Sequence, residues 1–284
     1  MRRGDEEFEI EPSAETRELV ASVRSRAVTA RTSPASGLPE AGTAGGVATR
    51  RRYREAVAAS IGKRYDVTDV IEEGSVLALY VARDLRHGRA VTLQVNPVLA
   101  KLADPERVRA ALASAATLSH PNILPVYDFD VMPNIVFYAT APLNGQSLRE
   151  RLERERPLPI GDAVRIACET AAALAHASER GVRHGDLRPK HILLRHDGVA
   201  VSSFALVDAL GKPEGASVAL TIGTPEYLSP EQLAGQGQAA GWSDLYSLGC
   251  VLYEMLAGES PFASPIQSLV VTRSLVALRR RRLD

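Results

Sequence analysis

The stretch VRHGDLRPKHILL at residues 182–194 decides the fold that this sequence predicts. It follows a long apolar run, DAVRIACETAAALAHASERG, whose helical pattern ends at Gly181. Five further stretches flank it in a fixed order: IEEGSVLALYVARD at 71–84, AVTLQV at 90–95, VSSFALV at 201–207, GTPEYLSPE at 223–231 and SDLYSLGCVLYEML at 243–256. None of them alone is specific, so the prediction depends on their common order and spacing.

Together the six stretches resemble the signature set of the bacterial class of eukaryotic-type Ser/Thr protein kinases, over roughly residues 64 to 262. The resemblance implies an α+β fold with two lobes. A small strand-rich N-lobe would occupy residues 64–141 and a mainly helical C-lobe residues 142–284. Whether such a fold is also an enzyme depends on the residues at the reacting centre and not on the fold.

Local patterns agree with this order of elements. Alternating strands are predicted up to AVTLQV, with Gly88 in a hairpin turn. The helix that follows is expected to have Asp104 as its N-cap and Pro105 at its first helical position. Helical patterns dominate after residue 147.

The composition excludes several classes of protein. A formal charge of zero gives no global field toward nucleic acid, so direct nucleic-acid binding is not expected. No apolar run reaches the ~18 residues of a membrane span, and the N-terminus is too acidic and polar for a signal peptide. A cytoplasmic protein is therefore expected, with Cys168 and Cys250 as buried, reduced thiols.

The residues before the kinase-like segment are predicted to form an N-terminal arm and a linker. Residues 1–30 are expected to form an arm with one short helix. The sequence EPSAETRELV in this arm resembles the closing helix of a helical-repeat domain of bacterial transcriptional activators. Residues 31–49 read as a flexible linker, and residues 50–284 as the kinase-like domain. Kinases of this family continue for two or three helices beyond the last apolar segment, so the C-lobe is expected to be truncated, with apolar surface left uncovered.

The glycine-rich loop that would cover the phosphates is degenerate. The pattern G-x-G-x-x-G reads Glu72 to Leu77, so that only its middle glycine, Gly74, is present. Glu72 occupies the first glycine position and Leu77 the third. Acidic side chains here repel a triphosphate, which predicts weak binding of ATP.

The ion pair that the resemblance implies between strand and helix is also missing. Gln94 stands at the position of the phosphate-binding Lys, and Ala111 at the position of its Glu partner. Residues 65–100 contain no Lys that could replace it. Since both charges are absent together, neither is left buried alone.

The loop that carries catalysis in the family is altered as well. His184 and Asp186 are present, and Asp186 is the remnant of the candidate base. Gly185 replaces an Arg, and Arg188 replaces a Lys. His191 and Ser203 replace the two metal ligands, an Asn and an Asp, so no metal site is expected.

Parts of the nucleotide pocket and of the scaffold are retained. The resemblance assigns purine contacts to Gly74, Leu79, Thr140, Ala141, Leu143 and Leu193, the backbone groups of Ala141 and Leu143 being offered to the ring. Thr92 replaces a small Ala and would crowd that ring. Structural roles are expected for His184, Phe204, Asp244 and Glu231, whose Arg partner would lie beyond residue 284.

The sequence therefore predicts a pseudokinase, a regulatory or protein-binding module with little or no phosphotransfer and no ATP or Mg²⁺ cofactor. Two alternatives stay open: a divergent active Ser/Thr kinase that uses Asp186, and the signal-receiving part of a transcription regulator. A decaying gene fragment is a further reading. The expected partner is a protein, either an active kinase or a transcription regulator.

Overall fold

The computed structural model describes residues 61–73, 78–96, 103–132, 135–210, 225–233 and 242–262. All of them belong to one compact unit, residues 49–284. The expectations for the N-terminal arm, the linker, Gly74, Leu77 and the last apolar segment lie outside the described residues.

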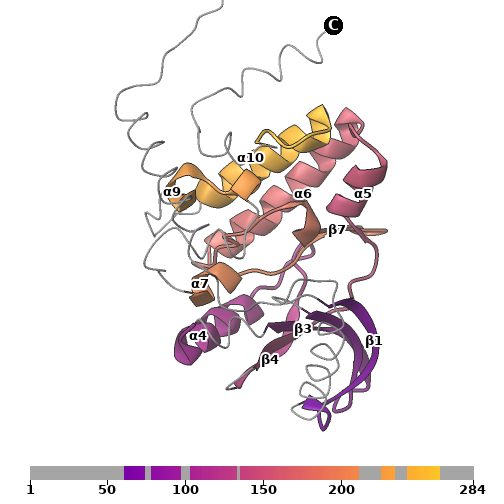
Figure 1. The fold of residues 1–284 in the computed structure, drawn as a ribbon, viewed down its shortest axis with the longest axis vertical. Coiled ribbons are helices and arrows are strands. Elements are labelled where there is room, and N and C mark those ends of the chain that lie inside the picture. Colours follow the sequence, from indigo (N-terminus) through magenta and orange to yellow (C-terminus); the bar gives the residue numbers. More distant parts are fainter. Residues whose placement is uncertain are drawn as a thin grey trace, which may run out of the picture. The chain divides into compact units, whose positions relative to one another are not determined.

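A five-stranded antiparallel sheet forms the first half of the described chain, with its strands in the order β1-β2-β3-β5-β4 (Figure 1). Its strands are β1 (Tyr65–Glu73), β2 (Ala78–Asp84), β3 (Arg89–Asn96), β4 (Val126–Met132) and β5 (Ile135–Thr140). The strand-rich N-lobe predicted from the sequence is thus present. Strand β5 is buried along its whole length, between β3 and β4.

The hairpin between β2 and β3 shows how local sequence sets this sheet. Gly88 has φ of +65°, a conformation that side chains disfavour. Asp84 accepts hydrogen bonds from the backbone N–H groups of Arg86 (3.0 Å) and His87 (3.2 Å). The turn residues therefore satisfy their own backbone donors and fix the register of the two strands.

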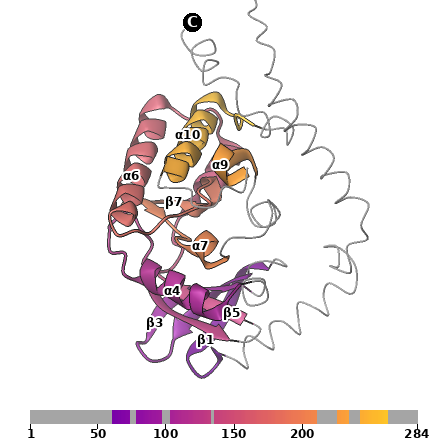
Figure 2. The same cartoon turned by 90° about the vertical axis from the view of Figure 1, so that its left-hand side faces the viewer.

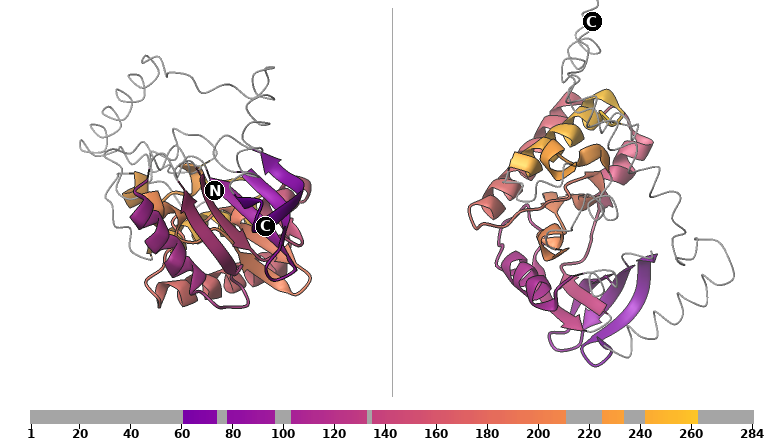
Figure 3. Two further views of the ribbon diagram at one scale, coloured as in Figure 1. Left: turned by 90° about the horizontal axis from the view of Figure 1, so that it is seen from below. Right: turned by 60° about the vertical axis from the view of Figure 1, so that its left-hand side comes forward.

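Helix α4 (Pro105–Ala116) begins as the sequence predicts. The Asp104 side chain accepts a hydrogen bond of 2.8 Å from the N–H of Glu106, and Pro105 occupies the first turn. Val108 and Leu112 are buried, and they pack against Val136 and Tyr138 of the sheet. Helix α4 therefore lies along the sheet, as Figure 3 shows from below.

The second half of the described chain is mainly helical. Its helices are α5 (Leu148–Arg154), α6 (Ile160–Ser178), α7 (Leu206–Leu210), α9 (Pro230–Leu233) and α10 (Trp242–Ala257). Two 3-10 turns, η1 (Pro189–His191) and η2 (Pro225–Tyr227), and a small sheet of β6 (Gln146–Ser147), β7 (Ile192–Arg195) and β8 (Gly198–Val201) complete it. Helices α6 and α10 lie side by side (Figures 1 and 2).

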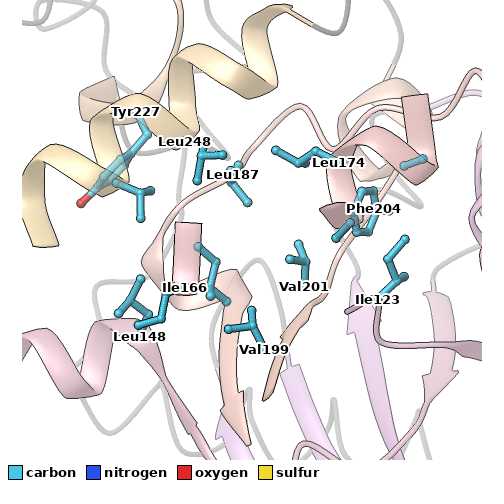
Figure 4. Packing of buried hydrophobic residues seen from close by; sticks show 14 of the residues in the cluster. Ile123, Leu148, Ile166, Leu174, Leu187, Val199, Val201, Phe204, Tyr227 and Leu248 are labelled. Atoms are coloured by element: carbon cyan, nitrogen blue, oxygen red, sulfur yellow. The ribbon is translucent and has the colours of Figure 1, made fainter. Parts of the chain in front are cut away.

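One large core holds this helical part together (Figure 4). Leu148 of α5, Ile166 of α6 and Val251 of α10 are completely buried in it, together with Leu187 of the loop before η1. Phe204 belongs to the same core. Leu187 of the loop at 184–191 is thus buried in the same core as Phe204, and this apolar packing anchors the loop.

Two expectations need correction or restriction here. Cys250 is buried, as predicted, but Cys168 is exposed on α6, because it lies on the face of the helix opposite Ile166 and Ala173. No helix among the described residues is long and apolar enough to cross a membrane.

Candidate functional site

Asp244 at the start of α10 holds the loop that contains the predicted site. Its carboxylate accepts one hydrogen bond from the N–H of His184 (2.8 Å) and another from the N–H of Gly185 (2.7 Å). All three groups are buried or nearly so. Hydrogen bonds to a charged acceptor are stronger than neutral ones, so Asp244 fixes the loop backbone. The sequence assigned this structural role to Asp244.

His184 is a neutral structural residue. One ring nitrogen, Nε2, donates to the carbonyl of Ser202 (2.8 Å), and the other, Nδ1, accepts from the N–H of Asp186 (3.2 Å). Burial lowers the pKa of His184 below its ordinary value. The ring lies 5.0 Å from the Phe204 ring, centroid to centroid. His184 therefore links the loop to the Ser202–Phe204 segment.

Asp186, the candidate base, lies beside a cation. Its carboxylate is 2.9 Å from the Arg188 guanidinium, and both side chains are nearly buried. Burial raises the pKa of Asp186 to about 6, against the opposing charges of Arg188 and Lys190. At neutral pH the group is an ion-paired carboxylate, and Arg188 occupies one of its oxygens.

His191, at one of the metal-ligand positions, is turned toward the protein. Its Nδ1 donates to the backbone carbonyl of Asp186 (2.9 Å), and its ring stacks against His184 at 5.5 Å. Burial and the charge of Arg188 lower the pKa of His191 well below its ordinary value. The imidazole is neutral and buried, and it is a nitrogen donor where Mg²⁺ prefers oxygen.

Gln94 has a partner that sequence reasoning missed. Gln94 on β3 and Tyr138 on β5 are paired in register, and the Tyr138 hydroxyl donates a hydrogen bond of 2.5 Å to Oε1 of Gln94. Both side chains are buried, and burial raises the pKa of Tyr138. Ser203 lines the same small cavity as Tyr138 and influences the pKa of its phenol, while the Ser203 hydroxyl donates to the Ser202 hydroxyl at 3.4 Å. Gln94, Tyr138 and Ser203 therefore form a neutral polar network, named here the Tyr138 network.

A signal for Tyr138 was present in the sequence. The strand NIVFYAT is apolar except for the hydroxyl of Tyr138 and the side chains at its two ends. A buried tyrosine needs a hydrogen-bond partner, and Gln94 lies on an equally apolar strand. The register that pairs them is set by the sheet and cannot be read from either strand alone.

The segment after Ser203 folds back as helix α7. Ser203 and Ala205 have positive φ values of 67° and 64°, which turn the chain. Ala209 then packs against α4 in the same cluster as Tyr138. Val207 points at the loop: a β-carbon built on Gly185 would lie 2.8 Å from its own. Helix α7 therefore fills the space beside Gly185, where the resemblance places an Arg.

The connecting segment after β5, residues 141–145, contains backbone groups that the resemblance assigns to a purine. The backbone N–H of Leu143 is not free, because it donates to the Thr92 hydroxyl (3.1 Å). The Thr140 hydroxyl contacts the carbonyl of Ala141 (3.0 Å). Ala141 and Leu143 also pack against Leu193. The structure thus brings Thr140, Ala141, Leu143 and Leu193 together, and protein atoms hold the Leu143 N–H and the Ala141 carbonyl.

A small cavity lies behind Thr140. Its free volume is about 10 Å³, enough for about one water molecule. The lining residues come from α4, the chain between α4 and β4, the start of β4, β5 and the Ser203–Phe204 segment: Leu112, Ala115, Leu118, Ile123, Leu124, Val126, Tyr138, Thr140, Ser203 and Phe204. Ala111, at the expected Glu position, is half-buried on α4 among apolar neighbours.

Charged residues remain near Asp186. Lys190 interacts with Glu72 of β1, whose charge raises the pKa of Lys190, although burial and Arg188 lower it overall. Leu79, expected on the purine, is half-buried on β2. Glu72 itself is exposed. Lys190 is exposed as well, and the charge of Glu72 acts on it from β1.

Glu231 has a hydrogen-bond partner within the described residues, and the Arg partner that the resemblance implies lies outside them. It is half-buried on α9, not fully buried, and the Ser243 hydroxyl donates to its carboxylate. Burial alone would raise the pKa of Glu231, but hydrogen bonds from Ser243 and its surroundings lower it. The carboxylate is therefore charged, and it is stabilised locally.

An ion pair between a half-buried arginine and a buried carboxylate joins α5 to α10, and the sequence did not indicate it. Arg149 donates to the carboxylate of Glu254 at 2.8 and 3.2 Å, and the Tyr227 hydroxyl donates to the same carboxylate at 2.5 Å. Glu254 is 2% exposed. Because the partners lie 105 residues apart, no sequence pattern pairs them.

Comparisons with known proteins place these residues in a family. The family described as protein kinase domain matches residues 65–280. The chain is 34% identical over 212 residues to the serine/threonine-protein kinase PknB of Mycobacterium leprae, covering 71% of this chain and 34% of that protein. It is 33% identical over 211 residues to the serine/threonine-protein kinase PrkC of Bacillus subtilis, covering 71% and 32%. The match thus spans about a third of each of these relatives.

Proposed function

The chain belongs to the protein kinase family, and we propose that its domain is a pseudokinase that acts as a regulatory or protein-binding module. Phosphoryl transfer depends on charges that hold the phosphates and the metal in place. The proposal is that this chain has lost those charges and retained the scaffold.

The Tyr138 network carries the proposal. Gln94 stands where the resemblance places the phosphate-binding Lys, and Ser203 where it places a metal-binding Asp. In the folded chain both lie beside one buried phenol, and Gln94 accepts its hydrogen bond at 2.5 Å. No group in this network carries a charge at neutral pH. A triphosphate would therefore meet neutral side chains that already satisfy one another.

The residues at the metal positions do not fit Mg²⁺. Ser203 has no carboxylate, and His191 presents a neutral imidazole whose Nδ1 proton is bound to a backbone carbonyl. Each 1.4 kcal/mol of lost transition-state stabilisation lowers a rate about tenfold. The combined loss of the Lys and of both metal ligands supports a turnover close to background.

The retained contacts support a binding role. Asp244 still fixes the loop at 184–186, and His184 still contacts Phe204. These contacts stabilise the loop through groups of the chain itself. A domain that keeps its loop ordered but lacks the charges for transfer is suited to recognising a protein. We propose an active kinase or a transcription regulator as the classes of partner to test first.

The test is a phosphotransfer assay with radiolabelled ATP and Mg²⁺ or Mn²⁺, for autophosphorylation and for transfer to a generic acceptor protein. Asp186→Asn is the matched control, because it removes only the candidate base. We expect the two proteins to give the same background signal. Turnover in the unaltered chain that Asp186→Asn abolishes would contradict the proposal.

One observation favours a divergent active kinase as the second candidate. Asp186 retains a carboxylate with a pKa of about 6, and Arg188 and Lys190 lie close to it. Two cations beside a base could replace missing phosphate contacts. In that case Lys190→Met would lower turnover, whereas Lys63→Met, at an exposed position before β1, would leave it unchanged. The pseudokinase proposal expects no effect from either.

A further inference from the structure

Thr92 and Thr140 lie opposite each other on β3 and β5, at the point where the chain leaves the sheet. Both are buried, with exposed fractions of 2% and 1%. The Thr92 hydroxyl accepts the N–H of Leu143 at 3.1 Å. The Thr140 hydroxyl has one proton to share between the carbonyls of Ala141 (3.0 Å) and Thr92 (3.4 Å). Two side-chain hydroxyls thus bind backbone groups of the connecting segment.

For adenine binding, the important one of these contacts is the hydrogen bond from the Leu143 N–H to the Thr92 hydroxyl. The edge of an adenine ring presents a nitrogen acceptor next to an amino donor, so it needs one backbone N–H and one carbonyl. A carbonyl oxygen has two lone pairs, and Ala141 can accept a second hydrogen bond. A backbone N–H has a single proton, and in this chain Thr92 holds that of Leu143.

We propose that Thr92 is a specificity-determining residue that keeps purines off the connecting segment by occupying the N–H of Leu143. The inference deepens the proposed function, because it concerns nucleotide recognition at the same site. It rests on the purine contacts that the family resemblance assigns to the connecting segment. It does not depend on whether the chain transfers phosphate.

The surroundings prevent the segment from simply moving aside. Ala141 and Leu143 pack against a buried cluster of Leu124, Leu193 and Ala200. A purine would therefore have to displace the Thr92 hydroxyl from a segment that stays in place. The hydroxyl would then be buried without a donor, which is unfavourable. We expect this displacement to weaken adenosine binding at least about tenfold, as judged from the usual size of such effects.

The binding test uses adenosine without metal, so that the phosphates and Mg²⁺ play no part. We expect Thr92→Ala to bind adenosine at least about tenfold more tightly than the unaltered chain. Thr92→Ser is the matched control: it keeps the hydroxyl and should show no gain. Equal affinity of the unaltered chain and Thr92→Ala would overturn the proposal, and so would an equal gain in Thr92→Ser.

Amide hydrogen exchange at Leu143 provides a second readout that needs no ligand. In the unaltered chain and in Thr92→Ser the N–H should be protected by the hydroxyl. In Thr92→Val, which has nearly the same volume but no hydroxyl, exchange should be roughly tenfold faster or more, the equivalent of one lost hydrogen bond. Unchanged exchange in Thr92→Val would refute the role of the hydroxyl. Phosphotransfer in the radiolabelled assay would refute only the proposed function, so the two failures are distinguishable.

Discussion

Gly185 and Val207 leave no room between them: a β-carbon on Gly185 would lie 2.8 Å from the β-carbon of Val207. Gly185 also has φ of +79°. A side chain at this position is therefore disfavoured twice, by its backbone conformation and by helix α7. The Arg that the family resemblance implies here could not be restored without moving α7.

The first prediction concerns this contact. Gly185→Ala should lower the free energy of unfolding by about 1 kcal/mol for the positive φ and by roughly 1–3 kcal/mol more for the steric conflict. Gly88→Ala is the matched control, because Gly88 has φ of +65° and a β-carbon at this position would meet nothing within 4 Å. Urea denaturation measures both. If the two variants lose equal stability, the contact with Val207 has no energetic importance.

The second prediction concerns the Tyr138 network. Tyr138→Phe removes the donor to Gln94 and leaves a buried amide oxygen without a partner, so stability should fall by roughly 1–3 kcal/mol. Replacing both residues by apolar ones, Tyr138→Phe with Gln94→Leu, should restore part of that loss. Thermal or urea unfolding of these variants and of Gln94→Leu alone gives the interaction free energy between the two side chains. Additive losses would show that the two side chains do not interact.

The third prediction is a pH dependence caused by Asp186. Its pKa rises from an ordinary value of 3.8 to about 6 in the folded chain, so the folded state binds the proton more tightly. The stability from protonation is present below about pH 4 and is lost as the pH rises through 6. The stability difference between the unaltered chain and Asp186→Asn should therefore fall by up to about 3 kcal/mol from pH 4 to pH 7.

Urea denaturation across this range is the measurement. The buried His184 and His191 have lowered pKa values, so their effect on the pH dependence is opposite to that of Asp186. Their contribution to the free energy of unfolding is lost as the pH falls below about 6.5. Both histidines are present in the unaltered chain and in Asp186→Asn, so their contribution largely cancels in the difference. A difference that is flat, or that rises with pH, would contradict the raised pKa of Asp186.

The fourth prediction concerns the ion pair between Arg149 and Glu254. Arg149→Met leaves the Glu254 carboxylate buried without its cation, and stability should fall by about 3 kcal/mol. Arg165→Met is the control, since its pair with Glu169 lies on the surface of α6 and should contribute less than about 1 kcal/mol. Equal losses in the two variants would mean that burial of Glu254 does not set the strength of its pair.

Local signals in the sequence were sufficient for much of the fold. The hairpin at Gly88 and the start of α4 at Asp104 depend on residues that lie close together in the chain. The contacts that define the site do not. Tyr138 and Gln94 are 44 residues apart, and Leu143 and Thr92 are 51.

Such pairs depend on strand order and register, which the folded chain sets as a whole. The sequence therefore indicated which positions had lost their charges, but not which neutral groups took their place. Thr92 illustrates the difference: its size was expected to crowd a ring, whereas its hydroxyl binds the backbone that the ring would use.

The two hydrogen bonds from the loop to Asp244 have a consequence for association. They fix the backbone of His184 and Gly185 when the chain folds, independently of nucleotide or metal. The loop itself is buried, but a protein that docks on exposed residues beside it, such as Lys190, would meet ordered backbone, so association there would lose little backbone entropy. Differences in affinity between related complexes lie mostly in the dissociation rate, so a gain in affinity from the order of this loop would be expected mainly in that rate.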